Sequence, residues 1–245
     1  MPTQTPVVLV TGAARRIGAA IARRLHAAGY SLAIHYRGGA DAAQALQAEL
    51  ELLRPDSVLL LQAELAQLER VPGLVEATVS RFGRLDALVN NASAFYPTPI
   101  GAATPAMWDE LFASNARAPF FLAQAAAPHL RASRGAIVNL LDIHAERPLR
   151  EHTVYVMAKA ALEAMTRSLA LELAPEVRVN GLALGAVLWP EQGRTEQQKA
   201  ALLEATPLGR AGSAEEVAEA VRWLLQEASY CTGQVLRLDG GRSLA

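Results

Sequence analysis

The sequence is poor in cysteine, in excess charge and in long apolar runs. Its single cysteine, Cys231, excludes an intramolecular disulfide and any Cys-cluster metal site, and fits a reducing compartment. The formal net charge of −1 gives no electrostatic reason to bind nucleic acid or an anionic membrane. No apolar run is long enough to cross a bilayer, and residues 1–6 do not resemble a signal peptide. We therefore expect a cytoplasmic protein without nucleic-acid or membrane partners.

Apolar residues are abundant, at 51% of the 245 residues, so the chain can bury one sizeable core. No linker or charge block divides it. Strand and helix patterns alternate, which predicts an α/β protein, a single-domain Rossmann-type fold over residues 1–245 with a doubly wound parallel sheet of about seven strands and helices on both faces. The predicted strands are 7–10, 31–36, 57–62, 86–90, 136–141, 177–182 and 234–238.

Helix starts are marked by capping patterns. Thr104-Pro105 places an N-cap before a proline at the first helical position and predicts a helix toward residue 115. Ser213 with Glu216 predicts a capping box for a helix to about residue 226, and Asp41 with Gln44 predicts another for a helix over 42–53. Further helical patterns cover 17–25, 71–82, 120–130 and 160–173.

The first strand runs directly into a glycine turn, Thr11-Gly-Ala-Ala-Arg-Arg-Ile-Gly18, and then into a helix. This order directs the free backbone N–H groups of a helix N-terminus toward a phosphate. Gly12 suits the tight turn, and Gly18 suits close packing of the helix. The pattern predicts a dinucleotide site.

The end of the second strand predicts which dinucleotide binds. NAD sites usually carry an acid there, whereas this chain has Arg37 and no acid before Asp41. Arg37, together with Arg15 or Arg16, would meet a 2′-phosphate, so NADPH is favoured. The alternative is that Arg37 is merely solvated.

Polar and aromatic side chains follow the fourth strand. Phe95 and Tyr96 stand just past its carboxyl end, in a loop bounded by prolines, where a planar ligand could stack or where both rings could anchor the core. Asn115 sits inside apolar helical sequence and needs a partner. A structural amide and a water-holding catalytic amide both fit it.

Three groups suited to proton transfer are predicted to meet after the fifth strand. Tyr155 and Lys159 are four residues apart and share one helix face, so the ammonium is expected to lower the pKa of the phenol. Asp142 ends the buried run 136–141, at the sheet edge where α/β proteins bind ligands. Tyr155 is therefore a candidate acid, with chance occurrence of the motif as the alternative.

Two further segments carry expectations about assembly and access. The helix over 160–173 is apolar on both faces, which favours a homo-oligomer, with a tetramer preferred. The stretch at about 185–206 contains Trp189 and a polar segment, and it is long enough to be a lid over the site.

These motifs resemble the short-chain dehydrogenase/reductase family over nearly the whole chain. Those in the family's order and approximate spacing are Thr11-Gly12 with Gly18, Asn90-Asn91-Ala92, Asn115, Tyr155-x-x-x-Lys159 and Asp239-Gly240-Gly241. The resemblance implies that Tyr155 is the acid/base, that Lys159 holds the nicotinamide ribose, and that Asn115 supports a proton-relay water. The family's usual Pro-Gly after the sixth strand is replaced here by Leu184-Gly185.

Three departures from that pattern resemble the pteridine reductases of the family. Asp142 stands where serine is usual, Arg16 where glycine is usual, and the loop over 90–99 has that subfamily's character. The resemblance implies that Arg16 reaches substrate and phosphate, that Phe95 stacks a pterin against the nicotinamide, and that Ser93 contacts the pterin. The implied cofactor residues are Gly12, Arg16, Ile17, Gly18, His35, Tyr36, Arg37, Glu64, Leu65, Asn91, Ala92, Ser93, Lys159 and Gly185. The implied substrate residues are Arg16, Ser93, Phe95, Asp142, Tyr155 and Trp189.

The expected function is therefore NADPH-dependent reduction of the C=N bond of a dihydropterin, with oxidised pterin and dihydrofolate as further candidate substrates. A carboxyl at position 142 suits this reaction because a ring nitrogen needs a proton, whereas a serine hydroxyl suits a carbonyl oxygen. The alternatives are a carbonyl reductase of a ketoacyl thioester or sugar-like ketone, and a non-catalytic NADP-binding regulatory protein.

Overall fold

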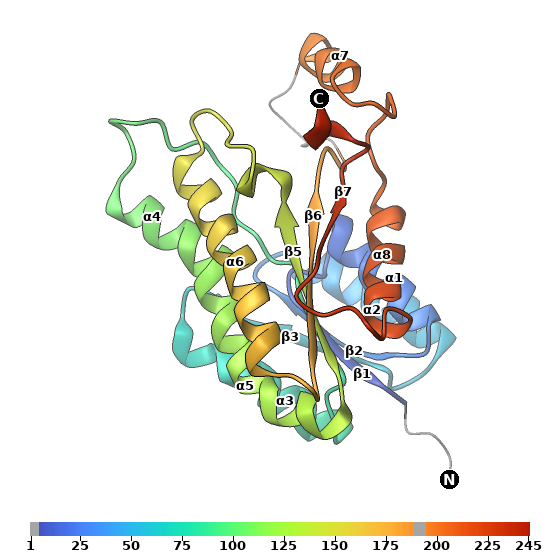
Figure 1. Cartoon of the computed structure of the whole chain (residues 1–245). Coiled ribbons are helices and arrows are strands. Elements are labelled where there is room, and N and C mark those ends of the chain that lie inside the picture. The colour runs from blue at the N-terminus through green and yellow to red at the C-terminus, as the bar shows by residue number, and fades with distance from the viewer. Residues whose placement is uncertain (1–4, 189–194) are drawn as a thin grey trace.

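The computed structural model describes residues 5–188 and 195–245. Its centre is a parallel seven-stranded sheet in the order β3-β2-β1-β4-β5-β6-β7 (Figure 1). The strands are β1 (Val7–Val10), β2 (Ser31–Tyr36), β3 (Val58–Gln62), β4 (Ala87–Asn90), β5 (Ala136–Asp142), β6 (Arg178–Leu184) and β7 (Val235–Leu238). The order reverses beside β1, which creates the crevice where such sheets bind ligands. The predicted Rossmann-type fold is confirmed.

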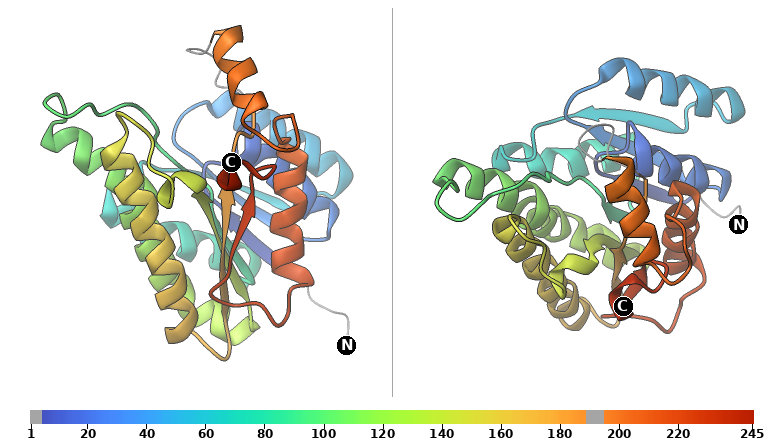
Figure 2. Two further views of the ribbon diagram at one scale, coloured as in Figure 1. Left: turned by 45° about the horizontal axis from the view of Figure 1, so that its top comes forward. Right: turned by 90° about the horizontal axis from the view of Figure 1, so that it is seen from above.

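Helices cover both faces of this sheet, as Figure 2 shows in two further views. One face carries α1 (Arg16–Ala27), α2 (Ala40–Leu53) and α8 (Ala214–Gln226). The other carries α3 (Val71–Phe82), α5 (Ala118–Ser133) and α6 (Thr153–Glu172), with α4 (Pro105–Phe112) packed beside α6. A further helix, α7 (Glu196–Glu204), lies beyond the carboxyl ends of β6 and β7 (Figure 1).

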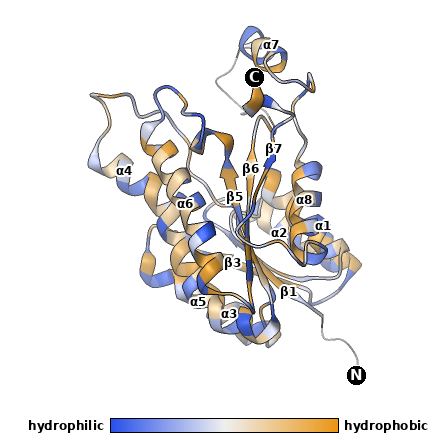
Figure 3. Cartoon of the chain, in the orientation of Figure 1, coloured by the Kyte–Doolittle hydropathy of each residue, from blue (hydrophilic) through white to orange (hydrophobic). Residues whose placement is uncertain are grey.

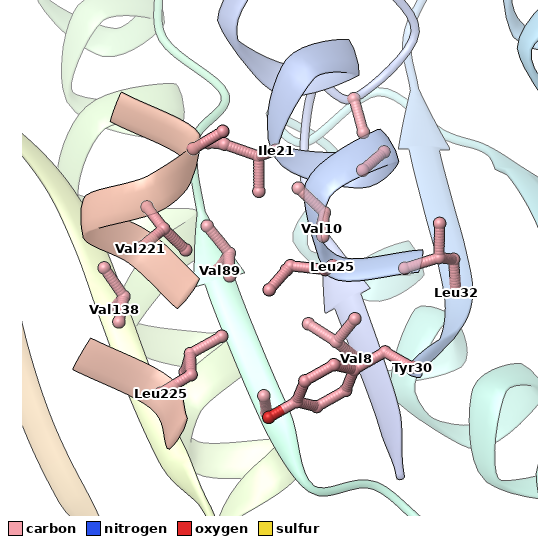
Figure 4. Packing of buried hydrophobic residues seen from close by; sticks show 14 of the residues in the cluster. Val8, Val10, Ile21, Leu25, Tyr30, Leu32, Val89, Val138, Val221 and Leu225 are labelled. Carbon is pink, nitrogen blue, oxygen red and sulfur yellow. The ribbon is translucent and has the colours of Figure 1, made fainter. Parts of the chain in front are cut away.

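The core lies between these layers because the strands are apolar on both faces, as buried parallel strands usually are. Apolar residues gather on the strands at the centre of the molecule (Figure 3). On the α1 side, Val8 and Val10 pack against Ile21 and Leu25 of α1, with Val221 of α8 beside them (Figure 4). A second cluster fills the α3, α5 and α6 side. Within the described residues, no helix is both long and apolar enough to cross a membrane.

Most buried polar side chains in the described part of the chain have hydrogen-bond partners, although Asn90 Oδ1 and the Thr98 hydroxyl have none. Asn90 and Asn139 stand opposite each other on β4 and β5, and the Asn90 amide donates to Asn139 at 2.8 Å. Asn139 in turn donates to the Thr166 hydroxyl of α6 at 2.9 Å. This chain of hydrogen bonds ties the sheet to the helix that carries Tyr155 and Lys159.

The capping predictions at Ser213 and Thr104 are confirmed by side-chain bonds to the first turns of α8 and α4. The prediction for Asp41 is wrong. Helix α2 begins two residues earlier than predicted, after Gly39 in a left-handed conformation, and the N-cap makes no side-chain bond. Asp41 instead lies in the first turn, where a negative charge favours the helix dipole.

The sequence predicts two separate helices on either side of residue 115, whereas the structure has no break between them. A π-helical turn, Ala113–Arg117, joins α4 directly to α5. Helix α7 was not predicted, although Thr195 and Gln198 form a capping box at its start.

Candidate active site

A cleft of about 760 Å³ opens at the carboxyl ends of the first strands. The predicted site residues that line it are Gly12, Arg16, Ile17, Gly18, His35, Tyr36, Arg37, Glu64, Leu65, Asn91, Ala92, Ser93 and Phe95. The remaining lining residues are Ala14, Arg15, Gly38, Ala94, Ser114 and Leu188. The structure thus brings most of the predicted cofactor residues to one cleft.

The glycine turn is held against the loop that follows β4. The Thr11 hydroxyl accepts the backbone N–H groups of Asn91 and Ala92 at 2.9 and 3.0 Å, and the Asn91 amide donates to the carbonyls of Thr11 and Gly12. Gly12 has φ +63°, which favours glycine. A Cβ at Gly18 would lie 2.3 Å from the Gly12 oxygen, so only glycine allows this approach of helix to turn.

His35 supports the cleft from beneath. Its Nδ1 accepts the Gly12 N–H at 3.2 Å, so its Nε2 carries the proton and donates to the Ala63 carbonyl at 3.1 Å. Burial lowers the pKa of the imidazole, which keeps this neutral tautomer. His35 therefore connects the ends of β1, β2 and β3.

The end of the cleft beside β2 carries two basic side chains. Arg37 is exposed and lies 3.8 Å from the Glu64 carboxylate. The Arg15 guanidinium lies against Gly39, where a Cβ would come within 2.2 Å of it. Of the two arginines that the sequence left open, Arg15 is therefore the one placed at the end of β2, while Arg16 adopts a left-handed φ of 53° in the turn.

The Tyr155 hydroxyl donates to the Asp142 carboxylate at 2.7 Å, as the spacing predicts for two groups at one sheet edge. The other carboxylate oxygen accepts the His144 backbone N–H at 2.9 Å. Both oxygens of Asp142 are thus oriented by donors. Tyr155 is almost fully buried, so this pair is largely shielded from water.

The predicted direction of the tyrosine pKa is wrong. Burial raises the pKa of Tyr155 well above its usual value, and the charge and hydrogen bond of Asp142 raise it further, while the Ser93 hydroxyl lowers it. Lys159 does not offset this, because its ammonium donates to the Leu140 carbonyl at 2.8 Å and lies 5.9 Å from the centre of the tyrosine ring. Burial lowers the pKa of Lys159 itself to about 8, although Asp142 raises it.

Asn115 holds the loop that faces Tyr155. Its side-chain oxygen accepts the Ser93 hydroxyl at 2.7 Å, and its amide donates to the carbonyls of Ala94 and Leu111 at 2.9 Å each. The π-helical turn around it directs the side chain toward this loop. These bonds agree with the interpretation of Asn115 as a structural amide. The Ser93 hydroxyl that donates to Asn115 is also the group that lowers the pKa of Tyr155.

The two aromatic residues after β4 have different environments. The Phe95 ring is 49% exposed and meets the Tyr155 ring edge-on, with centroids 4.8 Å apart. Tyr96 instead donates to the Glu110 carboxylate of α4 at 2.9 Å, so it anchors the loop. Only Phe95 lines the cleft.

Other predicted residues lie beside the cleft or outside the described part. Gly185 does not line the cleft, and its close packing against Asp239 leaves no room for a side chain. Asn115 adjoins the cleft through Ser93, and Tyr155 adjoins it through Phe95. Asp142 and Lys159 do not line the cleft and contact Tyr155 instead. Trp189 lies outside the described residues. Sequence reasoning missed Ser114, Leu188 and the ring of His152 over Phe95, since no motif marks them.

The chain is similar to known proteins over nearly its whole length. The family described as Enoyl-(Acyl carrier protein) reductase matches residues 12–243. Pteridine reductase 1 of Leishmania tarentolae is 39% identical, covering 98% of this chain and 96% of its own. The granaticin polyketide synthase putative ketoacyl reductase 2 of Streptomyces violaceoruber is 36% identical over 98% and 97%, and the 3-oxoacyl-(acyl-carrier-protein) reductase FabG of Staphylococcus aureus is 34% identical over 97% and 98%. The chain belongs to the short-chain dehydrogenase/reductase family, whose oxidoreductases use NAD(P)H.

Proposed function

We propose that the protein is an NADPH-dependent pteridine reductase that reduces the C=N bond of a dihydropterin to give the tetrahydro form. The observation that carries this proposal is the Asp142–Tyr155 hydrogen bond at the sheet edge. A carboxylate at this position suits protonation of a ring nitrogen. The likeness to pteridine reductase 1 supports the same substrate class.

The residues of the cleft fit the cofactor. Gly12 and Gly18 leave no space for a Cβ in the turn at the N-terminus of α1, which is the form of a phosphate cradle. Arg15 and Arg37 supply positive charge where an adenosine 2′-phosphate would lie. When bound, NADPH supplies the hydride for the reduction.

The proton is handled by the chain's own residues. Because its pKa is high, Tyr155 keeps its proton at neutral pH and presents it to Asp142. We propose that this coupled pair delivers one proton to the substrate ring nitrogen and is then reprotonated by water. The buried ammonium of Lys159 balances the carboxylate charge. The half-exposed Phe95 ring supplies a flat surface for the heterocycle.

The substrate class can be tested by following NADPH oxidation with dihydrobiopterin, dihydromonapterin, dihydrofolate and a panel of ketones. We expect turnover with the pterins. Turnover confined to ketones would contradict the proposed substrate and leave the cofactor assignment intact.

Replacing Arg37 by alanine is expected to raise the KM for NADPH about 10–100-fold, because a charged hydrogen bond to the 2′-phosphate is lost. The kcat/KM for NADH should stay within about twofold, since NADH lacks that phosphate. Steady-state kinetics with both cofactors checks this. Arg81→Ala, which removes an exposed partner of Asp56, is the matched control. Equal losses with NADH and NADPH would argue against the assignment.

Activity is expected to fall as the pH rises through about 8, because the Lys159 ammonium then loses its proton. Stability changes in the opposite sense. An unfolded lysine keeps its proton to about 10.5, so the penalty for burying this charge is fully present below pH 8 and is relieved between 8 and 10.5. The pH profile of kcat/KM, measured beside the Tm, separates the two effects. A kcat/KM that stays flat to pH 10 would contradict the role of Lys159.

Two alternatives remain as competing functions. The ketoacyl reductases among the relatives favour a carbonyl reductase in which Asp142 replaces the usual serine. A non-catalytic NADP-binding regulatory protein is less favoured, because the pairing of Asp142 with Tyr155 and the nearby Lys159 ammonium form a proton-transfer site. Tight NADPH binding without turnover on the whole substrate panel would support it.

Access and assembly are part of the proposal. We propose that the stretch predicted as a lid, about residues 185–206, covers the site; residues 189–194 of it lie outside the described part, while Leu188 lines the cleft and α7 lies beyond the sheet edge. An apolar groove along α5 and α6 includes Phe120 and Met165, and it supports a homo-oligomer, most simply a tetramer. We also propose that the protein is cytoplasmic, as expected from its single cysteine.

A further inference from the structure

The ring of Phe95 is held by two other rings. His152 stacks on it with centroids 4.7 Å apart and an interplanar angle of 17°, and Tyr155 meets it edge-on. Phe95 lies in a loop without helix or strand and is 49% exposed. A half-exposed ring in such a loop has several rotamers open to it. The two ring contacts therefore fix its orientation.

His152 is itself anchored. It is the N-cap of α6, three residues before Tyr155 on the same element. Its Nδ1 lies 2.7 Å from the Arg150 carbonyl, so this nitrogen carries a proton and donates it, which orients the imidazole. The position of His152 is thus set by the helix that carries the proposed acid.

The backbone around His152 is tied to the Phe95 loop. Glu151 adopts a left-handed φ of 61°, which is unfavourable for a residue with a side chain. Its carbonyl accepts the Thr98 N–H at 2.5 Å, and this bond joins the start of α6 to the loop after β4. Glu151 thus makes the bond to Thr98, and the next residue, His152, makes the stack on Phe95.

We propose that His152 is a positioning residue that holds the Phe95 ring flat for a planar heteroaromatic substrate. One face of Phe95 is covered by the imidazole, and the ring's exposed part is available to the ligand. A bicyclic heterocycle gains from such a stack, whereas an acyclic ketone does not. His152 therefore favours flat substrates. This inference rests on the proposed function, because it needs a pterin-like ligand beside Phe95.

The test measures the Kd of biopterin for the NADP⁺-loaded protein in variants of His152. His152→Ala is expected to raise the Kd about threefold to tenfold, as the loss of one aromatic pair implies. His152→Phe restores a flat ring and is expected to return the Kd to within about twofold of the wild type. The Kd for NADPH should not change. His129→Ala on α5 is the matched control.

A double-mutant cycle shows whether His152 acts through Phe95. In a Phe95→Leu background, His152→Ala should have no further effect on the Kd. If the two substitutions raised the Kd of biopterin by independent factors that multiply, the positioning role would be overturned. The same would follow if the wild type bound biopterin and His152→Ala bound it with an unchanged Kd. A wild type that binds no biopterin would instead overturn the proposed function itself.

Discussion

Replacing Asp142 by serine is expected to lower kcat with dihydrobiopterin by about 10²–10⁴-fold, the range for loss of a positioned proton donor. The variant removes the acceptor of the Tyr155 hydroxyl and the partner of the His144 N–H. Because Asp142 raises the pKa of Tyr155 and of Lys159, both pKa values should fall in the variant. The alkaline limb of the pH profile should therefore move below pH 8. Stopped-flow and steady-state NADPH oxidation measure these changes.

The cofactor site should be unaffected, so the Kd for NADPH is expected to stay within about twofold of the wild type. Asp142→Asn separates charge from shape, because its side-chain oxygen can still accept the Tyr155 hydroxyl. If the Asp142→Asn variant reduced pterins at the wild-type rate, the carboxylate would have no part in proton transfer. If Asp142→Ser gained ketone reduction, the residue at this position would decide between protonation of a ring nitrogen and reduction of a carbonyl.

Replacing Gly18 by alanine is expected to raise the Kd for NADPH at least about 100-fold, because a displaced phosphate loop loses several charge-assisted hydrogen bonds. The new Cβ would lie 2.3 Å from the Gly12 oxygen and 2.7 Å from the Asn91 amide nitrogen. Helix and turn must therefore separate, and the free energy of unfolding should fall by about 1–3 kcal/mol. Fluorescence titration with NADPH and urea unfolding measure the two effects.

Gly73 offers a matched control for that substitution. It lies in α3, and a Cβ there would meet no atom within 4 Å. Gly73→Ala should raise the free energy of unfolding by about 0.4–1 kcal/mol and leave the Kd for NADPH unchanged. Tight NADPH binding by the Gly18 variant would mean that the phosphates do not use this turn.

The strands and the glycine turn were predictable because each depends on local sequence. Buried parallel strands are continuous apolar runs, and a turn such as that at Gly12 requires a residue that tolerates positive φ. The start of α2 was not predictable from Asp41, since the left-handed Gly39 moves the helix start by two residues. Tertiary context decided which residue begins the helix.

The site was only partly predictable. The approach of Asp142 to Tyr155 follows from strand and helix positions, but the direction of the tyrosine pKa depends on burial and on which group receives the Lys159 ammonium. The burial of Tyr155 and the acceptor of the Lys159 ammonium depend on the folded structure and are not evident from the sequence. The stack of His152 on Phe95 joins the start of α6 to a loop that is distant in the chain, and no motif links them.

The bridge that His35 makes between Gly12 and Ala63 limits how the cofactor preference could be redesigned. A change toward NADH calls for an acidic side chain near the end of β2, where it can bind the ribose hydroxyls. An ionised acid in place of His35 would remove the donor to the Ala63 carbonyl and would leave a buried charge beneath the turn. The Arg37 side chain is 67% exposed and does not bridge the strand ends as His35 does. An engineer should therefore substitute position 37 and keep the imidazole at 35 unchanged.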